Sequence, residues 1–150
     1  MKAIDFGLRK CLKMYLIDTN IFLEVLLSQK RKDECESFLT QVKSGKKIGV
    51  VTDFTVHSII GIMGSLNRLN ELKTFLTSLT AYKGLRIYSA TLADEVNAIE
   101  IALNQQLDMD DSIQYSTALA LNVEAIISFD KHFDSLKIAR KEPKALENKE

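Results

Sequence analysis

The chain has 150 residues, of which 46% are hydrophobic and 27% are charged, and its formal net charge at pH 7 is zero. This composition is typical of one globular domain that is long enough to bury a core. The balanced charge argues against a protein that coats nucleic acid non-specifically, and no apolar run approaches the ~20 residues of a membrane helix. The basic start, MKAIDFGLRKCLK, has no apolar segment of a secretion signal. We therefore expect a cytoplasmic protein in which Cys11 and Cys35 are reduced thiols.

The first predicted strand, residues 14–18 (MYLID), runs from three apolar residues directly into Asp18. Thr19 and Asn20 are residues that often cap helices, and the apolar spacing that follows predicts a helix over 19–28. Asp18 is therefore expected at the carboxyl end of a strand. In open α/β sheets, ligands bind at that edge.

The rest of the chain alternates predicted helices and strands. Apolar residues at helical spacing predict helices over 32–44, 53–66, 70–82, 92–106 and 110–121. Short apolar runs predict strands over 47–52, 85–89, 124–128 and 136–139. Strands that alternate with helices imply a mostly parallel sheet with right-handed crossovers, and the runs IGVV and AII fit strands that are buried on both faces. The expected fold class is α/β, with a central sheet flanked by helices.

The predicted domain covers residues 14–142. We expect an N-terminal extension over 1–13, whose structure the sequence does not decide, and a charged, frayed C-terminal tail over 143–150 (PKALENKE). The two middle helices carry more apolar residues than one face of a sheet needs. These apolar residues fit either an ordinary core or a surface for a second copy of the chain. The residues are Met63, Leu66, Leu69, Leu72, Phe75, Leu76 and Leu79.

Aspartates follow several of the predicted strands. Asp18 ends the first strand, Asp53 follows the second, Asp130 follows AII, and Asp111 lies at the entry of the helix before that last strand. Because strand ends that feed helices share one edge of a parallel sheet, we expect these carboxylates to converge. Converging carboxylates raise one another's pKa unless a cation lies between them, and oxygen ligands suit Mg²⁺ or Mn²⁺. The residues therefore predict a divalent-metal site that acts on phosphate esters.

Three stretches resemble, in this order, the PIN-domain family, which includes the VapC-type toxins: MYLIDTNIFLEVLL, VTDFTVHSIIGIM and DDSIQYSTALALNVEAIISFDKHFDSL. The resemblance covers residues 14–136. It implies a PIN-like three-layer α/β/α sandwich and a ribonuclease that depends on Mg²⁺ or Mn²⁺ and hydrolyses RNA phosphodiester bonds. It also implies the toxin component of a toxin–antitoxin pair, with RNA as substrate, an antitoxin protein as partner and a homodimer as the assembly.

The resemblance also assigns site residues by motif position. Asp18, Asp111 and Asp130 match the family's catalytic and metal-binding acids, and Asn20 and Ser128 match polar residues that support them. A phosphatase-like enzyme with Asp18 as its nucleophile is ranked below this reading, because that chemistry would place a second acid where Asn20 stands.

One family position departs from the pattern. The family usually has a glutamate early in the helix after the second strand, and here His57 or Ser58 occupies that place, depending on the alignment by one residue. Asp53 lies one helical turn before His57 and could partly substitute, and His57 is itself either a partly buried helix residue or a ligand. His132 is expected in an exposed turn, in contact with solvent. The missing glutamate motivates an alternative function: a catalytically weakened PIN-like module that binds RNA or a protein partner without cutting.

Overall fold

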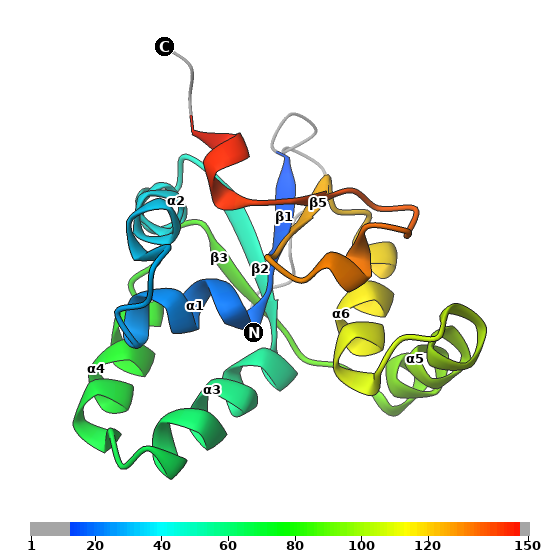
Figure 1. The fold of residues 1–150 in the computed structure, drawn as a ribbon, viewed down its shortest axis with the longest axis horizontal. Helices are drawn as coiled ribbons and strands as arrows, with labels where there is room; N and C mark the ends of the chain where they lie inside the picture. Colours follow the sequence, from blue (N-terminus) through cyan, green and yellow to red (C-terminus); the bar gives the residue numbers. More distant parts are fainter. Residues whose placement is uncertain (1–12, 148–150) are drawn as a thin grey trace.

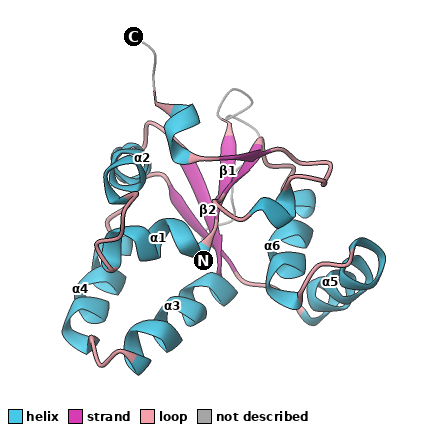
Figure 2. Ribbon diagram, in the orientation of Figure 1, coloured by secondary structure: helices cyan, strands magenta, loops and turns pink. Residues whose placement is uncertain are grey.

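The computed structural model describes residues 13–147, and a five-stranded parallel sheet forms its centre (Figure 1). The strand order is β3-β2-β1-β4-β5, and every neighbouring pair is parallel. Helices α1 to α4 lie on one side of the sheet, and α5 and α6 lie on the other (Figures 1 and 2). The three-layer α/β/α fold predicted from the sequence is therefore confirmed. The N-terminal extension, apart from its last residue, lies outside the described residues.

Apart from the last strand, the predicted helices and strands occur in the predicted order, with small shifts at their ends. None of the helices in the described part of the chain is long and apolar enough to span a membrane. The elements are β1 (Met14–Ile17), α1 (Thr19–Leu26), α2 (Lys32–Ser44), β2 (Ile48–Thr52), α3 (Asp53–Ser65), α4 (Leu69–Leu79), β3 (Leu85–Tyr88), α5 (Leu92–Gln105), α6 (Met109–Ala120), β4 (Ala125–Ile127), the 3₁₀ helix η1 (Lys131–Phe133), β5 (Arg140–Lys141) and the 3₁₀ helix η2 (Pro143–Leu146).

The central strands contribute side chains to both layers of helices. Ile17 of β1 and Ile127 of β4 pack in the larger core with residues of α1 to α4. Leu16 and Ile126 point the other way and pack in a second core with residues of α6. All four side chains are fully buried. Because successive residues of a strand face opposite sides of the sheet, a central strand is apolar throughout.

The last strand is not where the sequence predicted it. The prediction was 136–139, but the strand is β5, Arg140–Lys141, which pairs with β4 at the edge of the sheet. Leu136 and Ile138, whose apolar character suggested a strand, instead pack against the core on the α6 side. Charged residues suit an edge strand, because one of its sides has no strand partner.

The tail that was predicted to fray from residue 143 is instead folded up to residue 147. Pro143–Leu146 form η2, which packs against α2, and Pro143 is buried. Arg31, in the turn before α2, contacts this segment. Its guanidinium donates to Glu142 (2.7 Å). The same group lies over the ring of Phe129, 3.9 Å from the ring centroid. The C-terminal segment is therefore part of the domain.

The apolar residues of α3 and α4 divide between core and surface. Met63, Leu72 and Leu79 are buried in the larger core, whereas Leu66 and Leu69 are exposed. Three of the residues considered for a surface between two copies are thus used inside one chain, because α3 and α4 pack against each other and α3 packs on α1.

Gly84, in the turn before β3, allows two backbone segments to come unusually close. A Cβ at this position would lie 2.6 Å from the carbonyl oxygen of Val42 and closer still to that of Lys47. We expect Gly84→Ala to lower the free energy of unfolding by about 2 kcal/mol or more, because backbone atoms would have to move.

Gly64→Ala is the matched control, since Gly64 lies in α3 with no atom within 4 Å of a new Cβ. This variant should gain roughly 0.5–1 kcal/mol from helix propensity. Urea unfolding of both variants measures the difference. Equal stabilities would contradict the close approach described at Gly84.

Candidate functional site

Asp18 follows β1 directly and caps the first turn of α1. Its Oδ1 accepts a hydrogen bond from the backbone N–H of Thr19 (2.7 Å), and its Oδ2 accepts one from the hydroxyl of Ser128 (2.6 Å) and one from the amide of Asn20 (3.1 Å). The residue is only 8% exposed. Burial raises the pKa of Asp18 above its usual range, although the bonds from Ser128 and Thr19 act in the opposite direction.

Ser128 and Asn20 connect the ends of the two central strands, β1 and β4. The Asn20 amide donates to the Ser128 hydroxyl oxygen (3.2 Å), which also accepts from the backbone N–H of Asp130 (2.9 Å). The structure therefore places two of the predicted supporting residues, Asn20 and Ser128, between Asp18 and Asp130. Asp130 itself caps η1, where its Oδ1 accepts from the backbone N–H of His132 (2.9 Å).

Asp111 lies in the first turn of α6, behind the capping residue Asp108. The Asp108 side chain accepts a hydrogen bond from the Asp111 backbone N–H (2.8 Å). Asp111 is 7% exposed. Burial raises the pKa of Asp111 to about 6, and the negative charges of Asp130 and Asp108 add to the effect.

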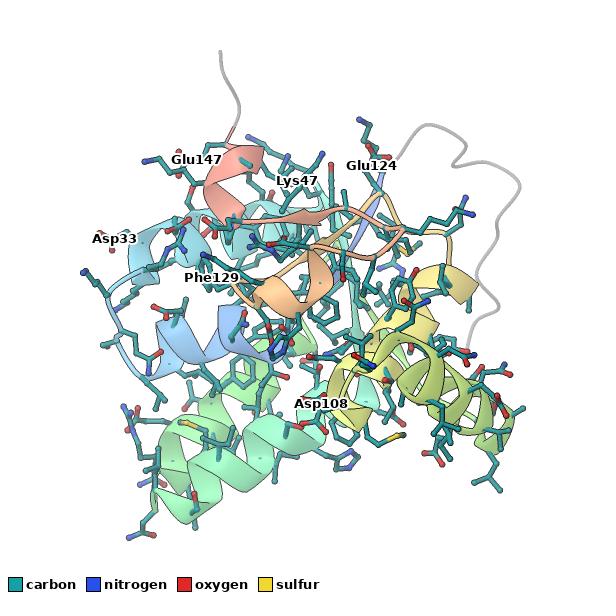
Figure 3. All side chains as sticks on the ribbon, turned by 45° about the vertical axis from the view of Figure 1, so that its right-hand side comes forward. Asp33, Lys47, Asp108, Glu124, Phe129 and Glu147 are labelled. Carbon is teal, nitrogen blue, oxygen red and sulfur yellow. The ribbon has the colours of Figure 1, made fainter. Side chains whose placement is uncertain are left out.

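The predicted acids of the site, Asp18, Asp111 and Asp130, line one cavity of about 270 Å³. Figure 3 shows Asp108 at the start of α6 and Phe129 in the turn after β4, on two of the segments that carry these acids. Among the described residues that line the cavity, five are aspartates and none is lysine or arginine. The full lining is Asp18, Thr19, Asn20, Leu23, Phe54, Ser58, Ile62, Asp108, Asp110, Asp111, Gln114 and Asp130.

The residues of this acidic cavity fit a divalent cation. Asp111, Asp130 and His132 each offer one ligand atom, and these atoms lie within 4.8 Å of one another. Gln114, which also lines the cavity, has a buried side-chain oxygen without a hydrogen-bond partner among the described residues. The described lining carries five aspartates without a lysine or arginine, together with a spare buried oxygen, and an oxygen-preferring cation such as Mg²⁺ or Mn²⁺ would satisfy both features.

Three of the four predicted supporting residues, Asp53, His57 and Ser128, lie outside the lining of the cavity, although Ser128 donates to Asp18. Asp53 turns its Oδ1 toward the backbone N–H groups of Phe54 (2.9 Å) and Ala90 (3.4 Å). The exposed His57 places Nδ1 2.8 Å from the carbonyl oxygen of Asp53, four residues earlier in α3. Ser58, by contrast, lines the cavity, so it is the α3 residue of this pair that faces the acids.

A buried polar layer lies behind Asp18 and was not predicted from the sequence. The amide of Gln114 donates to the hydroxyl of Thr55 (2.6 Å) and lies 3.4 Å from Asp18 Oδ1, and the Thr55 hydroxyl also accepts from that of Thr19 (3.3 Å). The spacing of Gln114, three residues after Asp111 on the same helix face, was the available signal. Thr55 gave no signal, because an isolated threonine in an apolar helix has no distinctive pattern.

His132 was expected to be solvated, and its position is more specific than that. Its side chain is 71% exposed, but Nδ1 lies 3.1 Å from Asp130 Oδ1 and 3.3 Å from Asp111 Oδ2. The hydrogen bond to Asp111 and the negative charge of Asp130 raise the pKa of His132.

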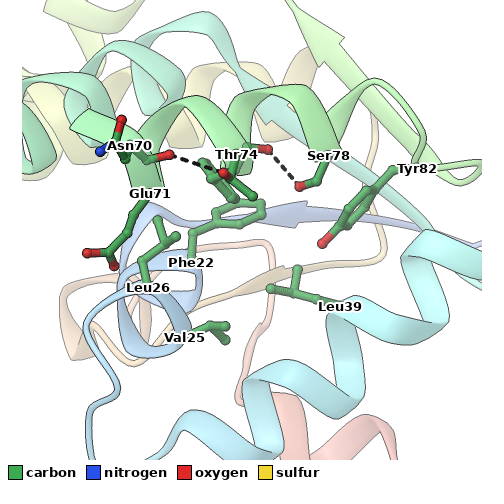
Figure 4. Close-up of a pocket in the computed structure, with 10 residues that line it drawn as sticks. Phe22, Val25, Leu26, Leu39, Asn70, Glu71, Thr74, Ser78 and Tyr82 are labelled. Carbon is green, nitrogen blue, oxygen red and sulfur yellow. Dashed lines mark hydrogen bonds between the residues drawn. The ribbon is translucent and has the colours of Figure 1, made fainter. Parts of the chain in front are cut away.

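A second pocket, of about 420 Å³, lies between α1, α2 and α4 (Figure 4). Its wall is largely apolar and includes Phe22, Leu26, Leu39 and Phe75. Glu71 is its one acidic residue among the described residues of the lining, and Arg68 pairs with that carboxylate. The acidic cavity is therefore the better candidate for metal-dependent chemistry.

The fold and the site define a class of protein: a parallel α/β/α domain with a cluster of carboxylates at the carboxyl edge of its sheet. Within that class, the chain belongs to the PIN domain family, whose pattern its sequence matches over residues 15–139. A search of curated proteins finds no match.

Several solved structures share the fold. A toxin–antitoxin complex from Klebsiella pneumoniae is 17% identical, with a TM-score of 0.64 over 86% of this chain and 97% of that one. The sarcin–ricin loop cleaving toxin VapC20 from Mycobacterium tuberculosis is 12% identical, with a TM-score of 0.65 over 83% and 96%. FitAcB from Neisseria gonorrhoeae is 19% identical, with a TM-score of 0.65 over 89% and 100%.

The raised pKa of Asp111 predicts how the free energy of unfolding depends on pH in the absence of metal. Unfolding lowers the pKa of Asp111 from about 6 toward its usual value of 3.8, so the folded state loses stability as pH rises through this interval. Asp111→Asn removes that loss. It should stabilise the protein by about 1 kcal/mol at pH 4.5 and by roughly 2–3 kcal/mol at pH 8.

Chemical denaturation in the presence of a chelator, at both pH values, measures this effect. Asp33→Asn is the control, because Asp33 is an exposed residue in the first turn of α2, outside the cavity. A gain that is the same at both pH values would show that Asp111 ionises normally in the folded protein.

Proposed function

We propose that this chain is a divalent-metal-dependent endoribonuclease that hydrolyses RNA phosphodiester bonds, and that it is the toxin component of a toxin–antitoxin pair. The observation that carries the proposal is the convergence of five aspartates on one cavity of a PIN domain, with no lysine or arginine among the described residues of its lining. The similar structures support it, since one is of a sarcin–ricin loop cleaving toxin and another is of a toxin–antitoxin complex. We place the reaction in the cytoplasm, where cellular RNA is available.

In this proposal, the acids of the site bind the cation and accept a proton. Asp18, Asp111 and Asp130 bind Mg²⁺ or Mn²⁺, and one of them accepts the proton of the attacking water. When bound, the ion supplies activation of that water and neutralisation of charge on the phosphate. Ser128 and Asn20 hold the Asp18 carboxylate in one orientation through their hydrogen bonds.

A specific observation favours the second candidate, a PIN module that binds RNA or a protein partner without cutting. Ser58 faces the acidic cavity from α3, at one of the two positions that match the family's usual glutamate. A serine hydroxyl carries no negative charge, so a site that relies on it would bind a cation more weakly than one with a carboxylate.

RNA cleavage separates the two candidates. The purified protein, incubated with a mixed-sequence RNA and increasing Mn²⁺, is expected to cut the RNA, and a chelator is expected to stop the reaction. Asp18→Asn and Asp130→Asn should each slow cleavage by roughly 10²-fold or more, because each removes a negative charge from the site. Asp33→Asn, outside the cavity, should cleave at the wild-type rate.

A protein that binds the same RNA but leaves it intact at every Mn²⁺ concentration would support the non-cutting module. Equal rates for wild type and both site variants would trace the activity to a contaminating nuclease and overturn the enzyme proposal.

The proposed assembly is a homodimer, and the structure suggests α5 as its contact surface. Four apolar side chains of this helix are exposed: Leu92 (81%), Val96 (58%), Ile99 (47%) and Leu103 (73%). Their spacing places them in one stripe, with the repeat seen where two helices pair. A contiguous apolar stripe in water is unfavourable, and a second copy of the same helix would cover it.

Replacing Val96 or Leu103 with glutamate should convert the dimer to a monomer, because each change places a charge in the stripe. Size-exclusion chromatography with light scattering measures the mass. The control is Asn97→Glu, an exposed position of α5 outside the stripe. Dimeric forms of both stripe variants would exclude this surface.

A further inference from the structure

His132 lies at the rim of the acidic cavity, with one ring nitrogen directed at two aspartates. Its Nδ1 is 3.1 Å from Asp130 Oδ1 and 3.3 Å from Asp111 Oδ2. One N–H cannot satisfy two carboxylates fully, but a cation between the three groups can bind all of them. The three ligand atoms lie within 4.8 Å of one another, so a single cation would be able to contact all of them.

Asp18 leaves a gap in the ligand set that a histidine could fill. A carboxylate has about four lone-pair sites, and those of Asp18 face the N–H groups of Thr19, Asn20 and Gln114 and the hydroxyl of Ser128. Asp18 can therefore offer the ion only the oxygen site that the long contact from Gln114 (3.4 Å) now occupies, so the ion needs further ligands. Asp111, by contrast, has His132 as the one hydrogen-bond donor to its carboxylate among the described residues.

We propose that His132 is a ligand of the metal, and that its nitrogen makes this site prefer Zn²⁺ or Co²⁺ to Mg²⁺ more strongly than carboxylates alone would. The inference rests on the proposed function, because it concerns the metal site of that enzyme. Imidazole nitrogen suits the later transition ions, whereas Mg²⁺ is bound by oxygen. His132 is mostly exposed and packs little, so its replacement leaves the fold intact.

The chain offers a direct spectroscopic test, because its sequence contains only two histidines, His57 and His132. In the untagged protein labelled with ¹⁵N at histidine, Zn²⁺ is expected to shift one ring nitrogen of His132 to the position of a metal-bound imidazole. The ring of His57, on the exposed side of α3, should not change. Unchanged His132 nitrogens at saturating Zn²⁺ would overturn the inference.

Calorimetric titration supplies the second measurement. His132→Asn should weaken Zn²⁺ binding by roughly tenfold or more, while Mg²⁺ binding changes much less. The matched control, His57→Asn, should bind both ions as the wild type does. If His132→Asn binds Zn²⁺ as tightly as wild type, or more tightly, then His132 only occupies the place of the cation and is displaced by it, and the inference fails.

RNA cleavage on the same preparations keeps the two proposals separate. RNA cleavage without coordination by His132 would overturn the proposal that His132 is a metal ligand but would still support the ribonuclease. Coordination by His132 without RNA cleavage at any metal concentration would support His132 as a metal ligand and would favour the module that does not cut RNA.

Discussion

The site depends on a hydrogen-bonded junction between the ends of two neighbouring parallel strands. The backbone N–H of Asp18 donates to the carbonyl oxygen of Ile127 (3.0 Å), and the hydroxyl of Ser128 donates to the Asp18 carboxylate. A buried carboxylate is stable only when its oxygens are satisfied. The junction supplies those donors from the sheet itself, so the position of Asp18 is as well defined as the pairing of β1 with β4. The loop that carries Asp130 begins at the same point.

Near this junction, several aspartates lie close together, and their negative charges repel one another. Asp108, Asp110 and Asp111 all lie at the start of α6, where the helix dipole and the free N–H groups favour negative charge. This local benefit, about 0.3–1 kcal/mol for each charge, is smaller than the repulsion and burial that raise the pKa of Asp111 to about 6. A cation bound among these acids would relieve that repulsion and stabilise the folded state, since a ligand that binds the folded state shifts the folding equilibrium.

Local sequence patterns predicted the fold and the acids at strand ends, because both depend on short-range periodicity and on the geometry of parallel sheets. Asp18 follows an apolar strand, and that alone placed it at the correct edge. The contacts of His132 could not be predicted, since they depend on how the turn after β4 folds over α6. The sequence could not decide whether His57 or Ser58 faces the acids. The answer depends on how α3 is rotated about its axis, and the alignment with the family was ambiguous by one residue. The C-terminal segment was misjudged because its composition is charged, while its packing comes from distant partners.

Those distant partners have a consequence for the order in which the site forms during synthesis. Ser128, which orients the Asp18 carboxylate, is made 110 residues after Asp18. The Ser128 carbonyl in turn accepts a hydrogen bond from Arg140 (3.0 Å), in the edge strand that closes the sheet. Domains fold as units once their residues have left the ribosome. The acidic cavity therefore cannot take its final form until the segment from Ser128 to Arg140 has left the ribosome, because these residues complete the hydrogen bonds around Asp18.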